Sequence, residues 1–274
     1  TPGNMFFRKY QGAGNDFIII DQRRQRWIAK EDRVFIERLC NRRLGIGADG
    51  LILLEEKPGF DFAMVYFNAD GRESTMCGNG GRCIAAFAQK IGAAADHCHF
   101  WAIDGPHEAR IQPRPGDRTS WWVELKMGDV PKVMRDDEAT FVLNTGSPHY
   151  VQFVKNVESF PVVETGRTVR YSDRFAPAGG INANFVEIVD EGLRIRTYER
   201  GVEDETLACG TGVTAAALAW HTKTTPTPGP AQVAVQTCGD HLQVRFEADG
   251  KGGFSNIWLC GPATEVFEGQ CKTF

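Results

Sequence analysis

Short runs of apolar, β-branched and aromatic residues recur along the chain, separated by Gly, Pro, Asn or Asp. This alternation is typical of strands bounded by turns. Helical patterns are fewer: residues 31–43 carry apolar residues at helical intervals, and residues 81–91 and 212–221 are Ala-rich with no Gly or Pro in their interiors. We expect strands over residues 17–21, 51–54, 62–67, 98–103, 121–125, 141–143, 150–154, 185–189, 193–198, 232–235, 242–246 and 257–259.

Many strands with a few helices favour an α+β fold with mostly antiparallel sheet, because a regular strand–helix alternation is missing. The order of strands, a Gly-rich tract, an Ala-rich helix and further strands occurs twice, which indicates two related domains. A boundary is expected after the strand at 121–125, within residues 126–131. Residues 222–230 contain three prolines and are predicted to form a rigid surface loop.

Length and charge narrow the class of protein. The 274 residues suffice for one large domain or two ordinary ones, and the net charge of −4 comes from interspersed acidic and basic residues. We therefore expect no nucleic-acid partner and no anionic membrane partner. No apolar run approaches the ~18–20 residues that span a bilayer. The first residues lack the basic and apolar regions of a signal peptide. Met5 is the expected natural start, with the four residues before it foreign to the natural chain.

The eight cysteines are expected to be free thiols in a reducing cytoplasm, since the chain contains no C-x-x-C and no secretion signal. A redox protein is disfavoured for the same reason. A structural zinc site is also disfavoured, because His97, Cys98 and His99 are too close together to form a standard zinc spacing alone.

Two tracts carry the chemistry: residues 76–80 (Met-Cys-Gly-Asn-Gly) and 208–212 (Ala-Cys-Gly-Thr-Gly). Each cysteine, Cys77 and Cys209, lies just before an Ala-rich helix, where the helix dipole and free N–H groups favour a thiolate. Two such cysteines suggest a pair of acid/base groups that face one substrate from opposite sides. The plainer alternative is a pair of Gly-rich helix starts with inert, buried cysteines.

The glycines of the first tract let a ligand approach the backbone, and the N–H groups of the following helix can hold a carboxylate. A dinucleotide or P-loop site is disfavoured, because G-x-G-x-x-G is absent and no G-K-[ST] follows. Asn15 follows a glycine turn and is either a ligand contact or a residue that fixes the turn. His149 is either a structural histidine or a neighbour of the reacting groups.

Together these segments resemble the diaminopimelate epimerases, pyridoxal-independent enzymes of lysine and cell-wall precursor synthesis. The resemblance implies two pseudo-symmetric domains, each a mostly antiparallel sheet wrapped around a central helix, with the site in the cleft between them. It also implies that the final strand returns to the first domain, so that the domains are 1–126 plus 263–274 and 127–262. The segments that carry the resemblance are residues 12–17, 45–50, 67–71, 76–83, 146–149, 181–183, 198–201, 208–212 and 261–264.

The resemblance implies epimerisation of LL-2,6-diaminopimelate to the meso isomer by a thiolate/thiol pair, with no cofactor and no metal, in a cytoplasmic homodimer. Cys77 and Cys209 are then the two bases, Cys77 for the D-centre and Cys209 for the L-centre. The implied carboxylate cradle consists of Gly78, Asn79, Gly210 and Thr211. The implied substrate contacts are Asn15, Asn68, Ser147, Asn182, Glu199 and Arg200, and the implied neighbours of the thiols are His149 and Glu199.

Two positions depart from the pattern of some family members. Gly50 stands where some have Gln, and Ser147 stands where some have Asn. Serine still donates and accepts a hydrogen bond, whereas glycine has no side chain to do so. We therefore expect Ser147, but not Gly50, to contact the substrate.

Other interpretations of these motifs remain open at this point. Proline and hydroxyproline racemases share the cysteine tracts but typically carry His in place of Asn79, and the Glu199–Arg200 pair favours a diamino diacid. The phenazine-biosynthesis isomerases lack the cysteine pair. A two-lobed protein that binds an amino acid without catalysis would have no reason to place a thiol at each helix start.

Overall fold

The computed structural model describes residues 3–224 and 226–272. The chain divides into two compact units: unit 1 comprises Thr1–Leu125 and Gly261–Phe274, and unit 2 is Lys126–Cys260. The bounds expected from the sequence differ from this division by one residue at the first crossing and by two at the second. None of the helices that the structure describes is long and apolar enough to cross a membrane.

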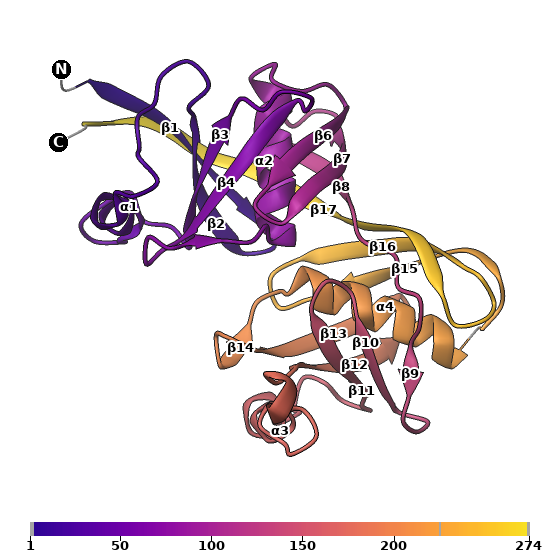
Figure 1. Ribbon diagram of the computed structural model, residues 1–274. Helices are drawn as coiled ribbons and strands as arrows, with labels where there is room; N and C mark the ends of the chain where they lie inside the picture. The colour runs from indigo at the N-terminus through magenta and orange to yellow at the C-terminus, as the bar shows by residue number, and fades with distance from the viewer. Residues whose placement is uncertain (1–2, 225, 273–274) are drawn as a thin grey trace. The chain divides into compact units, whose positions relative to one another are not determined.

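Unit 1 is a ring of strands around one helix (Figure 1). Its hydrogen-bonded order is β1, β2, β3, β4, β6, β7, β8 and β17, and β17 pairs with β1 to close the ring. Only β2–β3 and β4–β6 are parallel. The strands are β1 (Asn4–Gly12), β2 (Asn15–Asp21), β3 (Gly50–Glu55), β4 (Phe62–Asn68), β5 (Glu73–Ser74), β6 (His97–Ala102), β7 (Gly105–Pro113), β8 (Ser120–Lys126) and the later part of β17 (Phe254–Lys272).

Unit 2 repeats this order. β10, β11, β12, β13, β15, β16 and β17 pair in sequence, and the parallel pairs, β11–β12 and β13–β15, occupy the same two places as in unit 1. The expected pseudo-symmetry is therefore confirmed. The strands are β9 (Met134–Arg135), β10 (Thr140–Asn144), β11 (Pro148–Phe153), β12 (Asn182–Val189), β13 (Gly192–Glu199), β14 (Asp204–Thr206), β15 (Gly229–Gln236), β16 (His241–Ala248) and the start of β17.

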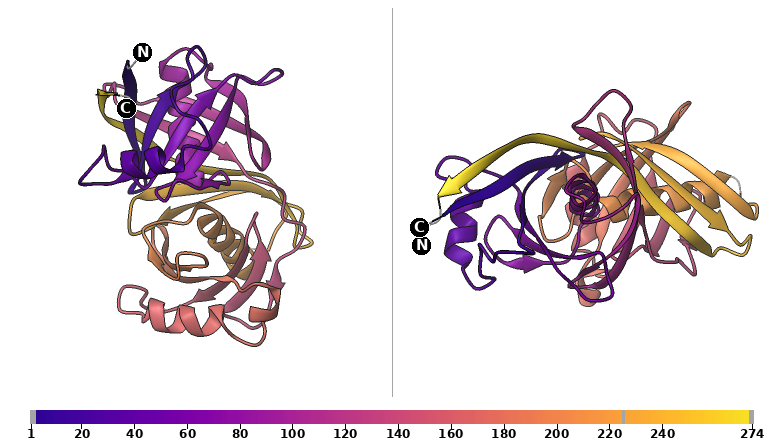
Figure 2. Two further views of the ribbon diagram at one scale, coloured as in Figure 1. Left: turned by 60° about the vertical axis from the view of Figure 1, so that its left-hand side comes forward. Right: turned by 90° about the horizontal axis from the view of Figure 1, so that it is seen from above.

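Within the described residues, each unit has one inner helix, α2 (Gly78–Lys90) or α4 (Gly210–Thr224). Both are rich in Ala and Gly and most of their residues are buried, because a helix with small side chains fits inside a ring of strands. The left view in Figure 2 looks along α4, with the strands of its own unit around it. The residue that precedes each inner helix is a cysteine.

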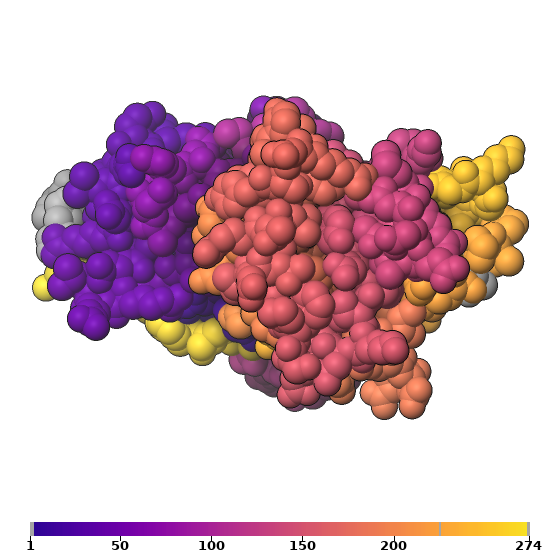
Figure 3. All heavy atoms as spheres, turned by 90° about the horizontal axis from the view of Figure 1, so that it is seen from below, coloured from indigo at the N-terminus to yellow at the C-terminus, as the bar shows by residue number. Residues whose placement is uncertain are grey.

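Each unit also has one outer helix, placed where the chain crosses between its first two parallel strands: α1 (Arg33–Cys40) and α3 (Val162–Arg170). Asp32 caps α1 by accepting from the N–H of Phe35. α3 packs on Phe185 and Tyr198 from the outside of its sheet, and its segment, coloured salmon, faces the viewer in Figure 3. A short 3₁₀ turn, η1 (Ala176–Ala178), follows it.

The twelve expected strands and three expected helices are confirmed, though α1 is shorter than the 31–43 segment predicted for it. No clear pattern in the sequence indicated α3, β1 or β7. The expected loop at 222–230 is wrong at both ends: α4 continues to Thr224, whose hydroxyl donates back to the Trp220 carbonyl, and β15 starts at Gly229. Thr225, within that segment, lies outside the described residues.

Candidate active site

Cys77 is the N-cap of α2, with an extended backbone (φ −101°, ψ 152°) that turns its side chain back over the helix start. The Cys77 Sγ accepts from the Gly80 N–H at 3.2 Å. A Cβ at Gly80 would lie 3.0 Å from this sulfur, so the glycine makes room for it. The sulfur thus lies among the N–H groups of the first helical turn, which Gly78 begins, where a negative charge is favoured.

A chain of polar side chains surrounds this helix start. The Arg82 side chain is fully buried and its Nη2 donates to Asn79 Oδ1 at 2.6 Å. Asn79 Nδ2 donates in turn to Asn15 Oδ1, and Asn15 Nδ2 donates to Asp49 Oδ2 at 3.2 Å. The structure therefore brings two predicted residues, Asn15 and Asn79, together with Cys77.

Sequence reasoning missed Arg82 and Asp49, the two charged ends of that chain. Arg82 carried a usable signal, because a lone arginine among the small and apolar residues of an inner helix must be paired when buried. No sequence signal indicated Asp49, because its contact with Asn15 arises from the way β2 and β3 begin side by side.

Asn68, another predicted contact, ends β4 and is exposed. Register places it opposite Gly50, and Gly50 opposite Phe17, two residues after Asn15. Asn68 therefore belongs to the same end of the unit 1 ring as Asn15. Its backbone N–H is engaged with the Arg72 carbonyl at 2.9 Å, which fixes the turn that follows β4.

Gly50 has a structural reason to lack a side chain. A Cβ there would lie 2.5 Å from Cε2 of Tyr66 and 2.6 Å from the carbonyl oxygen of Phe67. The Tyr66 ring, which also meets Phe17 edge-on at 6.0 Å between centroids, covers the position. In this chain Tyr66 fills the space that a glutamine at residue 50 would need.

We expect Gly50→Gln to lower the free energy of unfolding by about 1–3 kcal/mol, because the added side chain has to displace an aromatic ring and approach a backbone carbonyl. Urea denaturation measures the change. Gly128→Gln is the matched control, since a Cβ at Gly128 meets nothing within 4 Å. Equal unfolding midpoints for the two variants would show that Tyr66 moves aside freely.

Cys209 lies directly before α4, in the position that corresponds to Cys77. Its carbonyl accepts from Val213 N–H at 2.8 Å, and its Sγ lies 3.5 Å from Thr211 Oγ1. Burial raises the pKa of Cys209 to about 11, and the Glu199 charge acts in the same direction, while the Thr211 hydroxyl and the N–H groups of Thr211 and Gly212 oppose the rise. The N–H groups at the helix start thus favour the Cys209 thiolate, as expected from the sequence, but burial outweighs them and the net pKa is raised.

His149 is fully buried and contacts the Thr211 side chain. The His149 Nε2 and Thr211 Oγ1 are 2.8 Å apart, and His149 Nδ1 lies 3.0 Å from Asn184 Nδ2. Burial lowers the pKa of His149 to about 3, and the Arg200 charge lowers it further. The imidazole is therefore neutral at physiological pH.

Asn184, which the sequence analysis did not single out, sets the direction of these bonds. Its Oδ1 accepts from Thr197 and its Nδ2 donates to the Tyr150 carbonyl, both at 2.9 Å. The amide nitrogen consequently faces His149 Nδ1, which accepts, so that His149 Nε2–H donates to the Thr211 oxygen. This pattern assigns the tautomer and leaves the Thr211 hydroxyl proton free to donate to the Cys209 sulfur.

The remaining predicted residues of unit 2 meet around Asn182. Asn182 Oδ1 accepts from the Arg200 N–H at 2.9 Å and its Nδ2 donates to Ser147 Oγ at 2.9 Å. The Arg200 guanidinium donates to the Gly180 carbonyl at 3.2 Å. Burial raises the pKa of Glu199, the neighbouring acid. Ser147, Asn182 and Arg200 are thus held as one group by a single amide.

Comparison with known proteins finds relatives over nearly the whole chain. A family model described as diaminopimelate epimerase matches residues 7–133 and 141–265. The chain is 49% identical to a diaminopimelate epimerase from Flavobacterium psychrophilum, covering 95% of this chain and 97% of that one, and 38% identical to one from Aquifex aeolicus, covering 97% of each. Its fold is also similar to a solved phenazine biosynthesis protein of the PhzF family from Bacillus anthracis, with a TM-score of 0.75 at 13% identity over 98% of this chain and 99% of that one.

Proposed function

The chain belongs to the diaminopimelate epimerase family, and from this premise we propose that Cys77 and Cys209 are the two bases of its reaction. The reaction is the cofactor-independent conversion of LL-2,6-diaminopimelate to the meso isomer, in lysine biosynthesis. One observation carries the proposal: each pseudo-symmetric unit places a cysteine at the start of its buried inner helix. A pair of bases built from a repeated unit suits a reaction that removes a proton from one face of a carbon and returns one to the other.

The α-proton of an amino acid is very weakly acidic, so the protein has to stabilise the carbanion itself. The N–H groups at the start of α2, from Gly78 and Asn79, and at the start of α4, from Gly210 and Thr211, are proposed to hold the reacting carboxylate. Their partial positive charge acts where negative charge develops, with no pyridine ring needed. Exclusion of water from the reacting carbon strengthens the effect.

The two sulfurs must differ by one proton. For the LL substrate we assign Cys209 as the thiolate that removes the proton and Cys77 as the thiol that delivers one, with the roles reversed in the other direction. Because burial raises the pKa of Cys209, its thiolate is a strong base once formed. The Thr211 hydroxyl, oriented by neutral His149, is the side chain that favours this thiolate.

Recognition of a diamino diacid requires contacts beyond the reacting carbon. Arg200, whose planar fork can bind two carboxylate oxygens, is proposed to hold the distal carboxylate, and Glu199 to accept from the distal ammonium. Ser147 and Asn182 support the same group, and Asn15 and Asn68 are the proposed contacts in unit 1. A simple amino acid would leave the Arg200 charge without its partner, which favours the longer substrate.

Epimerisation in deuterated water tests the two-base assignment. Meso product from the first turnovers should carry deuterium at the inverted carbon, because the delivering thiol exchanges with solvent, while LL substrate re-isolated early should carry none. Mass spectrometry of the separated isomers measures both. Product without deuterium would rule out proton delivery from a solvent-exchanged group, and early labelling of LL substrate would indicate a single base that returns solvent protons to the same face.

We further propose that the enzyme works as a homodimer in the cytoplasm. Val266 and Phe267 on β17 are 55% and 46% exposed, and Phe6 on the neighbouring β1 is 43% exposed, which gives unit 1 an apolar surface suited to a second copy. The eight cysteines are free thiols in the structure, as a reducing compartment would keep them.

A further inference from the structure

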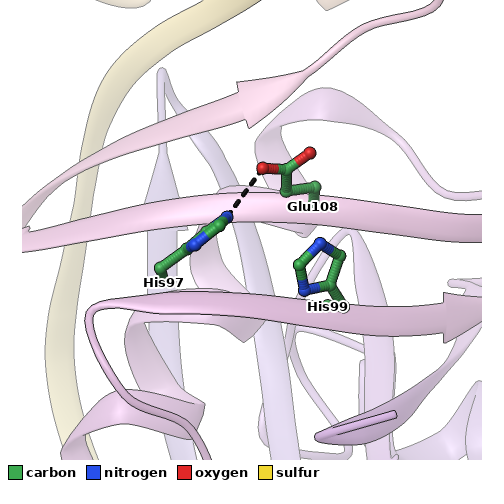
Figure 4. Close-up of side chains that lie close together, drawn as sticks. All are labelled: His97, His99 and Glu108. Carbon is green, nitrogen blue, oxygen red and sulfur yellow. Dashed lines mark hydrogen bonds and ion pairs between the residues drawn. The ribbon is translucent and has the colours of Figure 1, made fainter. Parts of the chain in front are cut away.

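Two histidines and a glutamate lie together on the outer face of unit 1, on the hairpin formed by β6 and β7. His97 and His99 are two residues apart on β6 and so share a face, while Cys98 between them points into the core and is fully buried. Glu108 lies on β7 directly opposite His99. Figure 4 shows the three side chains turned toward one another. Their ligand atoms all lie within 4.8 Å of one another.

We propose that His97, His99 and Glu108 bind a divalent transition-metal ion of the Zn²⁺, Co²⁺ or Ni²⁺ class. Two imidazole nitrogens and one carboxylate oxygen form a ligand set that these ions accept, and three protein ligands leave the remaining positions to water. Residues 97–99 alone are too close together to form a standard zinc spacing. The third ligand comes from the neighbouring strand, through a register that sequence spacing does not reveal.

The ligands are partly fixed before an ion arrives. The backbone of His99 is held on its other side by Asp61, whose carboxylate accepts from the His99 N–H at 2.8 Å and whose N–H donates to the His99 carbonyl at 2.9 Å. His97 Nε2 and Glu108 Oε1 are hydrogen-bonded at 2.6 Å. Binding forms the metal–nitrogen and metal–oxygen bonds in place of this hydrogen bond.

The surroundings favour exchangeable binding over a permanent structural ion. Both histidines are exposed, which leaves the site open to solvent. Arg110 stands opposite His97 on β7, and its charge opposes that of an incoming cation. We therefore expect an ion that braces the β6–β7 hairpin when present, in a fold that forms without it.

Titration of the full chain with Co²⁺ alone tests the proposal, because the absorption spectrum of bound cobalt reports its ligands. We expect a one-to-one complex with visible d–d bands and no intense near-ultraviolet sulfur-to-cobalt band. His97→Ala and His99→Ala should each weaken binding at least about tenfold, and Glu108→Gln should weaken it by about tenfold. His241→Ala, which removes an exposed histidine elsewhere, is the matched control and should bind cobalt as the unaltered chain does.

Three outcomes would overturn the proposal. The first is that the His97 and His99 variants bind cobalt as tightly as the unaltered chain. The second is a sulfur-to-cobalt band, which would place the ion on the cysteines. The third is that no cobalt binds at millimolar concentration. Epimerisation by His97→Ala should keep its normal kcat/KM, since the three ligands are separate from the groups assigned to catalysis. This activity also shows that the variant folds.

Discussion

Cys77→Ser and Cys209→Ser should each lower kcat/KM for epimerisation of LL-diaminopimelate by at least about 10³-fold, the upper part of the range for loss of a general acid or base. A hydroxyl is a far weaker acid than a thiol, so the variant can neither remove the α-proton nor hold the charge that follows. The substitution changes one atom and keeps the side-chain shape. Loss of activity would therefore report the chemistry of sulfur at these two positions.

The change in optical rotation as LL isomer becomes meso measures the loss. The fall must be equal for the forward and reverse reactions, because the equilibrium constant between the isomers does not depend on the enzyme. Cys238→Ser is the matched control, since Cys238 is an exposed cysteine in a turn of unit 2 and should keep full activity. Retention of more than a tenth of the activity by either serine variant would remove that residue from the pair.

Much of the fold could be predicted because each unit contains local sequence patterns that indicate its helices and strands. Gly-rich tracts and Ala-rich helices produce strong patterns at residues 76–91 and 208–221, and their repetition predicts two similar units. α3 could not be predicted in the same way. Its sequence is rich in β-branched residues, and it forms because its apolar side packs on Phe185 and Tyr198 of the sheet. Gly166 allows the approach, since a Cβ there would lie 2.4 Å from Tyr198 Cβ.

The residues of the candidate site also fall into two groups: those that a local sequence pattern indicates, and those that only the folded chain brings together. The place of Asn79 and Thr211 at a helix start could be predicted, because both lie in Gly-rich tracts directly before Ala-rich segments. Asn184 was not, because its contact with His149 depends on the parallel register of β11 and β12. The raised pKa of Cys209 could not be predicted for a physical reason: the sequence shows the helix start, whereas burial, which raises the pKa, belongs to the folded unit.

Thr211→Val should lower kcat/KM by about 10²-fold, comparable to the loss of one donor from a charge-stabilising site. The valine keeps the shape of threonine but removes the hydroxyl that donates to Cys209 Sγ and accepts from His149 Nε2–H. Because that hydroxyl lowers the pKa of Cys209, its removal raises this pKa further. Less Cys209 is then thiolate at a given pH, and the rising limb of the profile of kcat/KM against pH should move to higher pH.

The pH profile separates this role from a structural one. Thr211→Val also leaves the buried His149 N–H without its acceptor, which should lower the free energy of unfolding by about 1–3 kcal/mol. Lost stability alone would lower kcat/KM by the same factor at every pH, without moving the rising limb of the profile. Thr211→Ser restores a hydroxyl and should restore both the position of the rising limb and most of the activity. A valine profile that overlays the normal one after scaling would mean that Thr211 only supports His149, and that the backbone N–H groups of α4 alone stabilise the Cys209 thiolate.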